Sequence, residues 1–135
     1  MKRIIVLVAL FAAVYYAYKS HYLGGVSSAS QYSISNIQDQ PIPQDALFEL
    51  WHEAALKMCN DSVKSFNISQ SQCINRVDSR KESCKAIGRR NASTVVESEY
   101  EAKQLGKAYL HCAIPGYYCN GTEVKTEEEA RRNCQ

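Results

Sequence analysis

The sequence predicts an all-α protein: a small disulfide-stapled bundle of three helices plus a short C-terminal helix, behind an N-terminal transmembrane helix. The basic start Met1–Arg3 precedes an apolar run over residues 4–18, a pattern typical of membrane targeting. All six cysteines follow that run, which indicates an oxidising compartment and a disulfide framework. Apolar residues then recur at helical spacing, and no long alternation of β-branched residues indicates a sheet.

Residues 1–23 are interpreted as a signal-anchor transmembrane helix that stays attached. Extending the apolar run to Leu23 gives a segment of about 20 residues, roughly 30 Å long, enough to span a bilayer. Tyr16 and Tyr18 stand where a signal peptidase needs small residues, and tyrosine rings suit a membrane interface. Lys2 and Arg3 should hold the amino end in the cytoplasm. Cleavage beyond this segment stays open as the alternative.

Residues 24–44 are expected to form a flexible tether. The segment begins with Gly24 and Gly25, carries few large apolar side chains, and ends with Pro41 and Pro43. Such a composition buries too little surface to offset the entropy of ordering the chain. Residues 45–135 then remain as one small helical extracytoplasmic domain, whose modest core makes stabilising disulfides expected.

The first two helices of this domain follow from apolar spacing and from capping residues. Leu47, Trp51, Ala54 and Met58 recur at helical intervals after Asp45, and the pattern breaks near residues 66–68. A second helix should begin at a capping box of Ser69 and Gln72. Its apolar seam should run from Cys73 to Ile87, and Gly88 should end it.

Two further helices are predicted in the last third of the chain. Thr94 and Glu97 have the spacing of a capping box, so a third helix should begin there and end before Pro115. A short fourth helix should begin at Thr126, with Glu129 completing its capping box. The intervening segment 122–126 is too short and polar to predict a core strand.

The six cysteines are expected to form structural disulfides rather than redox or zinc sites, because no Cys-x-x-Cys or zinc-ligand spacing occurs. Cys59 and Cys73 are each seven residues from a turn near Phe66, so they should face one another across a helical hairpin. Cys84 should lie about 16 Å further along the second helix. The expected pairs are Cys59–Cys73, Cys84–Cys134 and Cys112–Cys119.

Four Asn-x-Ser/Thr sequences occur, at Asn60, Asn67, Asn91 and Asn120. In an exported eukaryotic protein they would be glycan acceptors on surface loops. The same residues are also favoured in turns and helix caps. The short basic start and small helical domain favour a bacterial envelope protein, but bacterial or eukaryotic origin and glycosylation stay open.

No catalytic residues, cofactor site or metal site are predicted, so the protein is not expected to be an enzyme. His52 and Glu53 lack the second histidine that a zinc-protease helix would carry. His52 and His111 are expected to be hydrogen-bonded or exposed rather than paired on a metal.

Two surfaces are candidates for contact with a partner. Lys81, Lys85 and Arg89 fall four residues apart on the predicted second helix and make one basic stripe. Tyr117 and Tyr118 lie in a turn that should be held by flanking cysteines, and tyrosine is common among interface hot spots. Nucleic acid is not an expected partner, because the domain is expected outside the cytoplasm and no aromatic residues interleave with the basic stripe.

The function predicted from these features is that of a membrane-tethered extracytoplasmic protein-binding module: an adaptor, an inhibitor or an immunity-type protector. Its expected location is the bacterial inner membrane, crossed once, with the C-terminal domain in the periplasm and another envelope protein as partner. The alternatives are a structural subunit of a cell-envelope complex, or a secreted or glycosylated eukaryotic type II membrane ectodomain.

Overall fold

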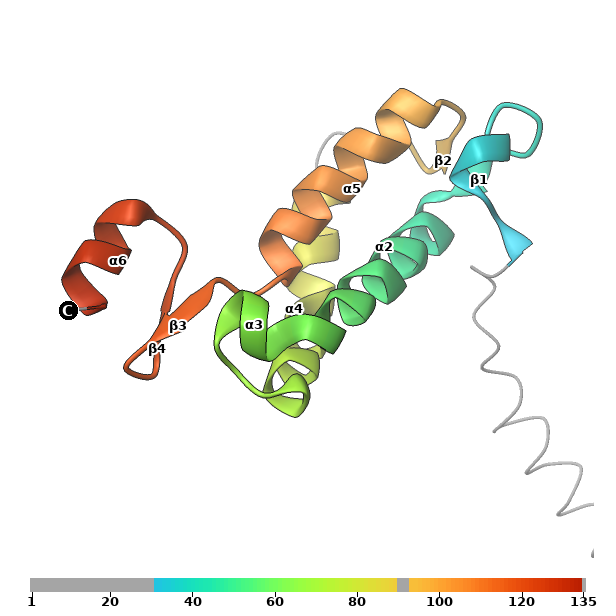
Figure 1. Cartoon of the computed structure of the whole chain (residues 1–135). Helices are drawn as coiled ribbons and strands as arrows, with labels where there is room; N and C mark the ends of the chain where they lie inside the picture. The colour runs from blue at the N-terminus through green and yellow to red at the C-terminus, as the bar shows by residue number, and fades with distance from the viewer. Residues whose placement is uncertain (1–30, 90–92, 135) are drawn as a thin grey trace, which may run out of the picture.

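The computed structural model describes residues 31–89 and 93–134, and it is mostly helical, as the sequence predicts. Three helices make the body of the domain: α2 (Gln44–Met58), α4 (Gln70–Arg89) and α5 (Glu99–Ala113). A smaller C-terminal unit stands away from one end of this body (Figure 1). It consists of β3 (Tyr117–Cys119), β4 (Thr122–Val124) and α6 (Glu127–Asn133). The predicted transmembrane segment 1–23 lies outside the described residues.

Helix α2 follows Pro43 and carries Asp45 in its first turn, as predicted. Its buried side follows Leu47, Phe48 and Ala55, whereas Met58 at the end of the predicted stripe is 46% exposed. The chain continues through a 3-10 turn, η3 (Cys59–Asp61), into the short helix α3 (Ser62–Phe66). Asn67 ends α3 with a left-handed backbone, at φ 56°. This turn brings the next helix back along α2.

Helix α4 starts at the predicted capping box. The Ser69 amide donates to Gln72 Oε1 at 3.0 Å, and the Gln72 amide donates to Ser69 Oγ at 3.3 Å. Gly88 was expected to end this helix, but it lies inside it, under the ring of Phe48. A Cβ at Gly88 would come within 2.6 Å of that ring, so the glycine permits close packing rather than helix termination.

The segment before α5 corrects the predicted capping box at Thr94. Val95 and Val96 form a two-residue strand, β2 (Val95–Val96), that pairs antiparallel with β1 (Ile42–Pro43). Helix α5 begins later, and its cap is Ser98, whose Oγ accepts from the Glu101 amide at 3.1 Å. Val96 is fully buried in the core cluster with Ile37 and Ile42, and burial of a β-branched side chain favours the strand at this position.

The folded part also begins before residue 45, which corrects the boundary expected from the sequence. A 3-10 turn, η2 (Ile34–Asn36), leads to Ile37, which is buried. Ile37 and Ile42 belong to a core cluster with Leu47 and residues of β2 and α5. Ile37 and Ile42 therefore pack in the core of the domain, and residues 32–44 are not a simple spacer.

The C-terminal unit contains a hairpin that the sequence did not predict. Strands β3 and β4 pair antiparallel around a turn of Asn120 and Gly121, whose φ values are 50° and 80°. Asn-Gly with two positive φ angles is the favoured two-residue hairpin turn. Helix α6 follows with the predicted capping box of Thr126 and Glu129.

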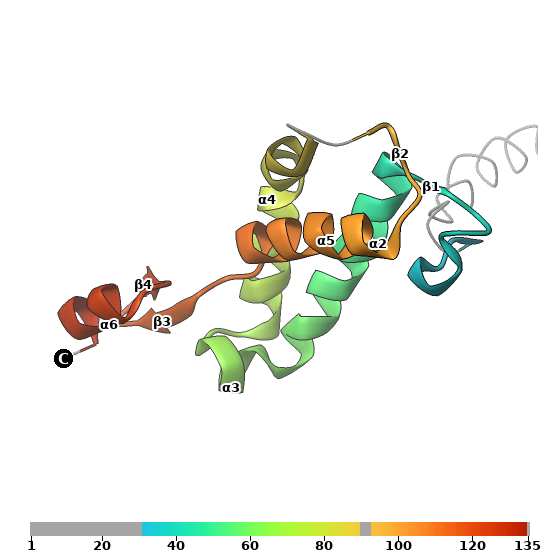
Figure 2. The ribbon, with the colours of Figure 1, turned by 90° about the horizontal axis from the view of Figure 1, so that it is seen from above.

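Three disulfides join the elements, and one of the predicted pairs is confirmed. Cys59–Cys73 bridges α2 and α4 across their turn. The other two predicted pairs are wrong, because the bonds are Cys84–Cys112 and Cys119–Cys134. Two reasons combine: α5 starts later than predicted, and it crosses α4 instead of running back along its whole length (Figure 2). Cys112 therefore reaches Cys84 in the last third of α4, and Cys119 bonds to Cys134 in the C-terminal tail.

Candidate binding groove

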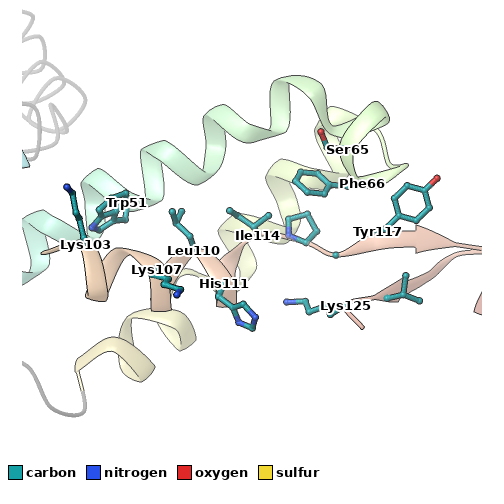
Figure 3. Close-up of a pocket in the computed structure, with 13 residues that line it drawn as sticks. Trp51, Ser65, Phe66, Lys103, Lys107, Leu110, His111, Ile114, Tyr117 and Lys125 are labelled. Atoms are coloured by element: carbon teal, nitrogen blue, oxygen red, sulfur yellow. The ribbon is translucent and has the colours of Figure 1, made fainter. Parts of the chain in front are cut away.

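A groove of about 710 Å³ lies where α5 ends, between the turn of α2 into α3 and the base of the β3–β4 hairpin. Apolar side chains line one part of it: Trp51, Phe66, Leu110, Ile114 and Tyr117. Basic side chains line another part: Lys103, Lys107, His111 and Lys125. Figure 3 shows Lys107, His111 and Lys125 along one side of the row formed by Leu110 and Ile114. We call these nine residues together the lysine-rimmed groove.

The apolar row follows from how the helices pack. Leu110 and Ile114 are four residues apart on and just after α5, so they project from one side of the helix. Both, together with Phe66, rest on the core cluster around Cys59 and Cys73. The apolar row is thus packed against the Cys59–Cys73 disulfide and the buried side chains around it.

Trp51 closes one end of the groove through a close contact with Gly106. A Cβ at Gly106 would lie 2.1 Å from the indole ring, so only glycine allows the ring to rest on α5 here. The indole N–H is buried and has no hydrogen-bond partner among the described residues. Trp51 therefore contributes ring area rather than a hydrogen bond, with α2 and α5 held close together at this point.

The cationic side of the groove is a stripe on α5. Lys103, Lys107 and His111 are four residues apart, a spacing that places them on one helix face, and Lys125 joins them from the chain after β4. Among the residues that the structure describes, no carboxylate lines the groove. Lys103 pairs with Glu99 at 2.6 Å, whereas Lys107 makes no ion pair within residues 31–89 and 93–134.

A second hollow, of about 630 Å³, borders the first. It is lined by Ile87 and Cys112, among others, and it shares Lys107, His111 and Lys125 with the lysine-rimmed groove. These three side chains consequently form a ridge between two concave surfaces. A segment bound in either hollow would contact Lys107, His111 and Lys125.

Glu123 anchors the hairpin that contributes Tyr117 to the groove. Its carboxylate accepts two hydrogen bonds from the Arg80 guanidinium on α4, one from the Gly116 amide at 2.7 Å, and one from the Tyr118 hydroxyl at 3.2 Å. Burial opposes ionisation of this carboxyl, but the bonds from Arg80 and Gly116 outweigh it and lower the pKa of Glu123 to about 2. The hairpin is therefore tied to the helical body by a charge-assisted network.

The two tyrosines proposed as partner contacts have different environments. Tyr117 is 48% exposed and lines the groove, whereas Tyr118 is buried. The Asn67 side-chain amide donates to the Tyr118 carbonyl at 2.8 Å, and the Arg76 guanidinium lies over the Tyr118 ring. Tyr118 thus holds the hairpin in place, and only Tyr117 offers its ring to a partner. The Cys112–Cys119 bond expected to hold this turn is replaced by the Glu123 network.

The basic stripe predicted on the second helix faces α2 instead of open solvent. Lys81 and Lys85 donate to the two carboxylate oxygens of Glu49, at 2.7 and 2.6 Å, and Arg89 pairs with Asp45. Burial opposes ionisation of Glu49, yet hydrogen bonds from both lysines lower its pKa overall. Lys85 is buried, so this stripe joins two helices and is a poor surface for a partner.

The two histidines of the domain have different environments. His52 is buried, with Nδ1 2.9 Å from the Tyr109 hydroxyl and Nε2 3.0 Å from Asp78. Burial, together with the nearby Glu49, Glu82 and Asp78 carboxylates, raises the pKa of Tyr109 to about 12. His111 is exposed at the groove. In the described part of the chain, no group of three or more potential ligands is arranged to hold a metal ion.

Sequence reasoning missed the cations of the groove. The spacing of Lys103, Lys107 and His111 is visible in the sequence, but α4 carries a longer run of charges, which is the stronger sequence signal for a basic surface. The link to Tyr117 and Lys125 depends on a hairpin that was not predicted.

Comparison with models of known protein families, with curated proteins and with solved structures finds no match. Within the described ranges, no helix combines the length and apolar character needed to cross a bilayer.

Proposed function

We propose that this chain is a non-enzymatic protein-binding module, tethered to a membrane and acting outside the cytoplasm as an adaptor, an inhibitor or an immunity-type protector. The lysine-rimmed groove is the observation that carries this proposal. It presents a concave apolar row beside exposed cations, and Tyr117 projects from a hairpin at its edge. A buried apolar anchor with a polar rim is the usual composition of a protein interface.

The rigidity of the domain supports a binding role. Disulfides join α2 to α4 and α4 to α5, and the Glu123 network fixes the hairpin against α4. A surface that is already ordered loses less conformational entropy when a partner binds. The groove is therefore built from elements that hold its shape in the free protein.

The cellular location is part of the same proposal. The pattern of residues 1–23 supports a single-pass anchor in a bacterial inner membrane, with the domain in the periplasm and an envelope protein as partner. Three disulfides are typical of an oxidising compartment. A glycosylated eukaryotic ectodomain is the second candidate, since Asn60, Asn67 and Asn120 are all exposed. A mass shift on treatment with peptide N-glycosidase would identify that second case.

Site-specific photo-crosslinking in living cells tests the binding role. A benzophenone amino acid at position 117, on the groove, is compared with the same amino acid at position 100, where Tyr100 is 76% exposed outside the groove. We expect a discrete adduct with one envelope protein from position 117 only. Equal adducts from both positions, or none from position 117, would contradict the proposal.

The partner identified in this way is then purified and its affinity measured. Tyr117→Ala should weaken binding by more than about tenfold, because a half-exposed tyrosine ring that a partner covers is a common hot spot. Tyr100→Ala should change the affinity by less than about twofold. Deleting residues 1–23 should leave binding intact for a binding module and abolish it for a structural subunit that assembles through its membrane helix.

A further inference from the structure

We infer that the lysine-rimmed groove binds an acidic protein segment that carries apolar side chains along one edge. This inference rests on the proposed binding function and adds the chemical class of the partner. The groove is distinct from the basic stripe on α4, whose cations are already neutralised by Glu49 and Asp45. In the groove, Lys103 pairs with Glu99 and Lys125 lies 3.8 Å from Glu123, whereas Lys107 makes no ion pair with a described residue and is open to a partner.

Charge complementarity is the first support. Lys103, Lys107, His111 and Lys125 line the groove, and no carboxylate among the described residues lines it with them. Lys107, in the middle of the stripe, makes no ion pair with any described residue. A segment with acidic side chains would pair with Lys107, whereas a basic segment would be repelled.

The position of the apolar row is the second support. Leu110 and Ile114 lie next to the cationic stripe on the same helix, and Trp51 and Tyr117 extend the row at its two ends (Figure 3). A partner that only carried negative charge would leave this row exposed to water. A segment with apolar side chains on one edge and acids on the other would cover both parts at once.

The spacing of the basic residues sets the size of the segment. Lys103 and His111 are eight residues apart on α5, which corresponds to about 12 Å along the helix axis. Two turns of a helix, or about four residues of extended chain, cover that length. The recognised segment is therefore short, with two or three acids near one or two apolar residues.

Selection from a random dodecapeptide library tests this inference while the natural partner is still unidentified. The full chain, with its disulfides intact, is held in nanodiscs of neutral lipid, and selected peptides are synthesised for affinity measurement. We expect enrichment of peptides with Asp or Glu beside an aromatic or large aliphatic residue. Their affinity should fall as ionic strength rises, because exposed charge pairs are screened by salt.

Two matched double variants assign the effect to the groove. Lys103→Gln with Lys107→Gln should weaken the selected acidic peptides about tenfold, mainly through a slower association rate. Lys57→Gln with Arg131→Gln removes the same charge from exposed positions outside the groove, and it should change affinity by less than about twofold. All variants are compared by circular dichroism to show that the fold is kept.

Different results of the peptide selection would contradict the acidic class of the partner and the groove as a docking site. Neutral or basic peptides that still depend on Tyr117 would overturn the acidic class and leave the binding groove standing. Peptides insensitive to both Tyr117→Ala and the Lys103/Lys107 variant, or no selected peptide at all, would overturn the groove as a docking site. Dihexanoyl phosphatidylglycerol is tested against dihexanoyl phosphatidylcholine as a competitor. Groove-dependent binding of the anionic lipid alone, with no acidic peptide selected, would assign the site to lipid and overturn the inference.

Discussion

Trp51 connects the packing of the core to the shape of the groove. Its ring rests on Gly106 of α5 and also contacts core clusters on both sides. Because the indole N–H has no hydrogen-bond partner among the described residues, the ring acts through contact area alone. The distance between α2 and α5, and with it the width of the groove at this end, depends on the absence of a side chain at Gly106.

Gly106→Ala should destabilise the domain although alanine is the better helix former. The added methyl group would overlap the Trp51 ring and force it to move, which costs about 1–3 kcal/mol. Urea unfolding measures the loss, with Gln104→Ala on the exposed side of α5 as the control. Combining Gly106→Ala with Trp51→Leu should cost less than the sum of the two single changes. A Gly106→Ala protein that is more stable than the wild type would show that the ring moves freely.

Tyr109 should make the domain sensitive to alkaline pH. Its pKa is raised from 10 to about 12 in the folded state, so the stability it contributes is complete below pH 10 and is lost as pH rises through 12. Tyr109→Phe should remove this part of the alkaline unfolding and cost about 1–2 kcal/mol near neutrality, because His52 loses a buried hydrogen bond. Unfolding free energies at pH 8 to 11 test both statements, and Tyr100→Phe, at an exposed tyrosine, should change neither.

At the scale of elements, ion pairs and disulfides decide how helices and hairpin are positioned. Glu49 joins α2 to α4 through two lysines, while Glu123 joins β4 to α4 through Arg80. The first pairing fixes the helical body, and the second fixes the hairpin that carries Tyr117. The basic residues of α4 that the sequence indicates as partner contacts thus form ion pairs within the domain.

Glu123→Gln should loosen the hairpin and change the acid stability of the protein. The depressed pKa of Glu123 contributes stability that is present above about pH 4.5 and is lost as pH falls towards 2. The substitution should cost about 1–3 kcal/mol at pH 7, since Arg80 loses a charge-assisted pair. It should also flatten the acid limb of the stability curve.

Hydrogen exchange locates that effect of Glu123→Gln, with increased exchange expected in β3 and β4 while α2 and α4 keep their protection. Glu128→Gln, at an exposed carboxylate of α6, is the control and should leave the acid limb unchanged. Uniformly increased exchange would show that Glu123 supports the whole domain rather than the hairpin.

At the scale of the molecule, the three disulfides divide the domain into a protected body and an accessible C-terminal unit. Cys59 and Cys73 are fully buried, and Cys84 is fully buried beneath α5. Cys134 is exposed at the end of α6, and its bond to Cys119 encloses only the hairpin and that helix. The C-terminal unit can therefore lose its disulfide without opening the helical core.

Graded reduction should break these bonds in a defined order. Low concentrations of reductant should expose Cys119 and Cys134 to alkylation first, because a thiolate must reach the sulfur that it attacks. Mass spectrometry of alkylated peptides identifies the order, and the same experiment in denaturant should show no preference. Reduction of the two buried bonds should then cost about 2–5 kcal/mol each and markedly lower the melting temperature. Early alkylation of Cys59 and Cys73 would contradict this order.

The sequence by itself determined several features that depend on residues close along the chain, although the capping box expected at Thr94 is wrong and the Asn120–Gly121 hairpin was not predicted. The capping boxes at Ser69 and Thr126 and the Cys59–Cys73 bond were predicted, because each depends on short spacings within a helix or one turn. The role of Tyr117 as a contact residue rests on its type and turn position, and it stays a prediction. These predictions did not depend on how the helices cross.

The tertiary structure alone decided the features that join distant residues. Ile42 pairs with Val96, Cys84 reaches Cys112, and Trp51 rests on Gly106 only because α5 begins late and crosses the other two helices. Helical periodicity gives the face of a helix but not the angle or height at which it meets its neighbour. Packing of the buried side chains sets that angle, and it thereby placed Lys103, Lys107 and Tyr117 around one groove.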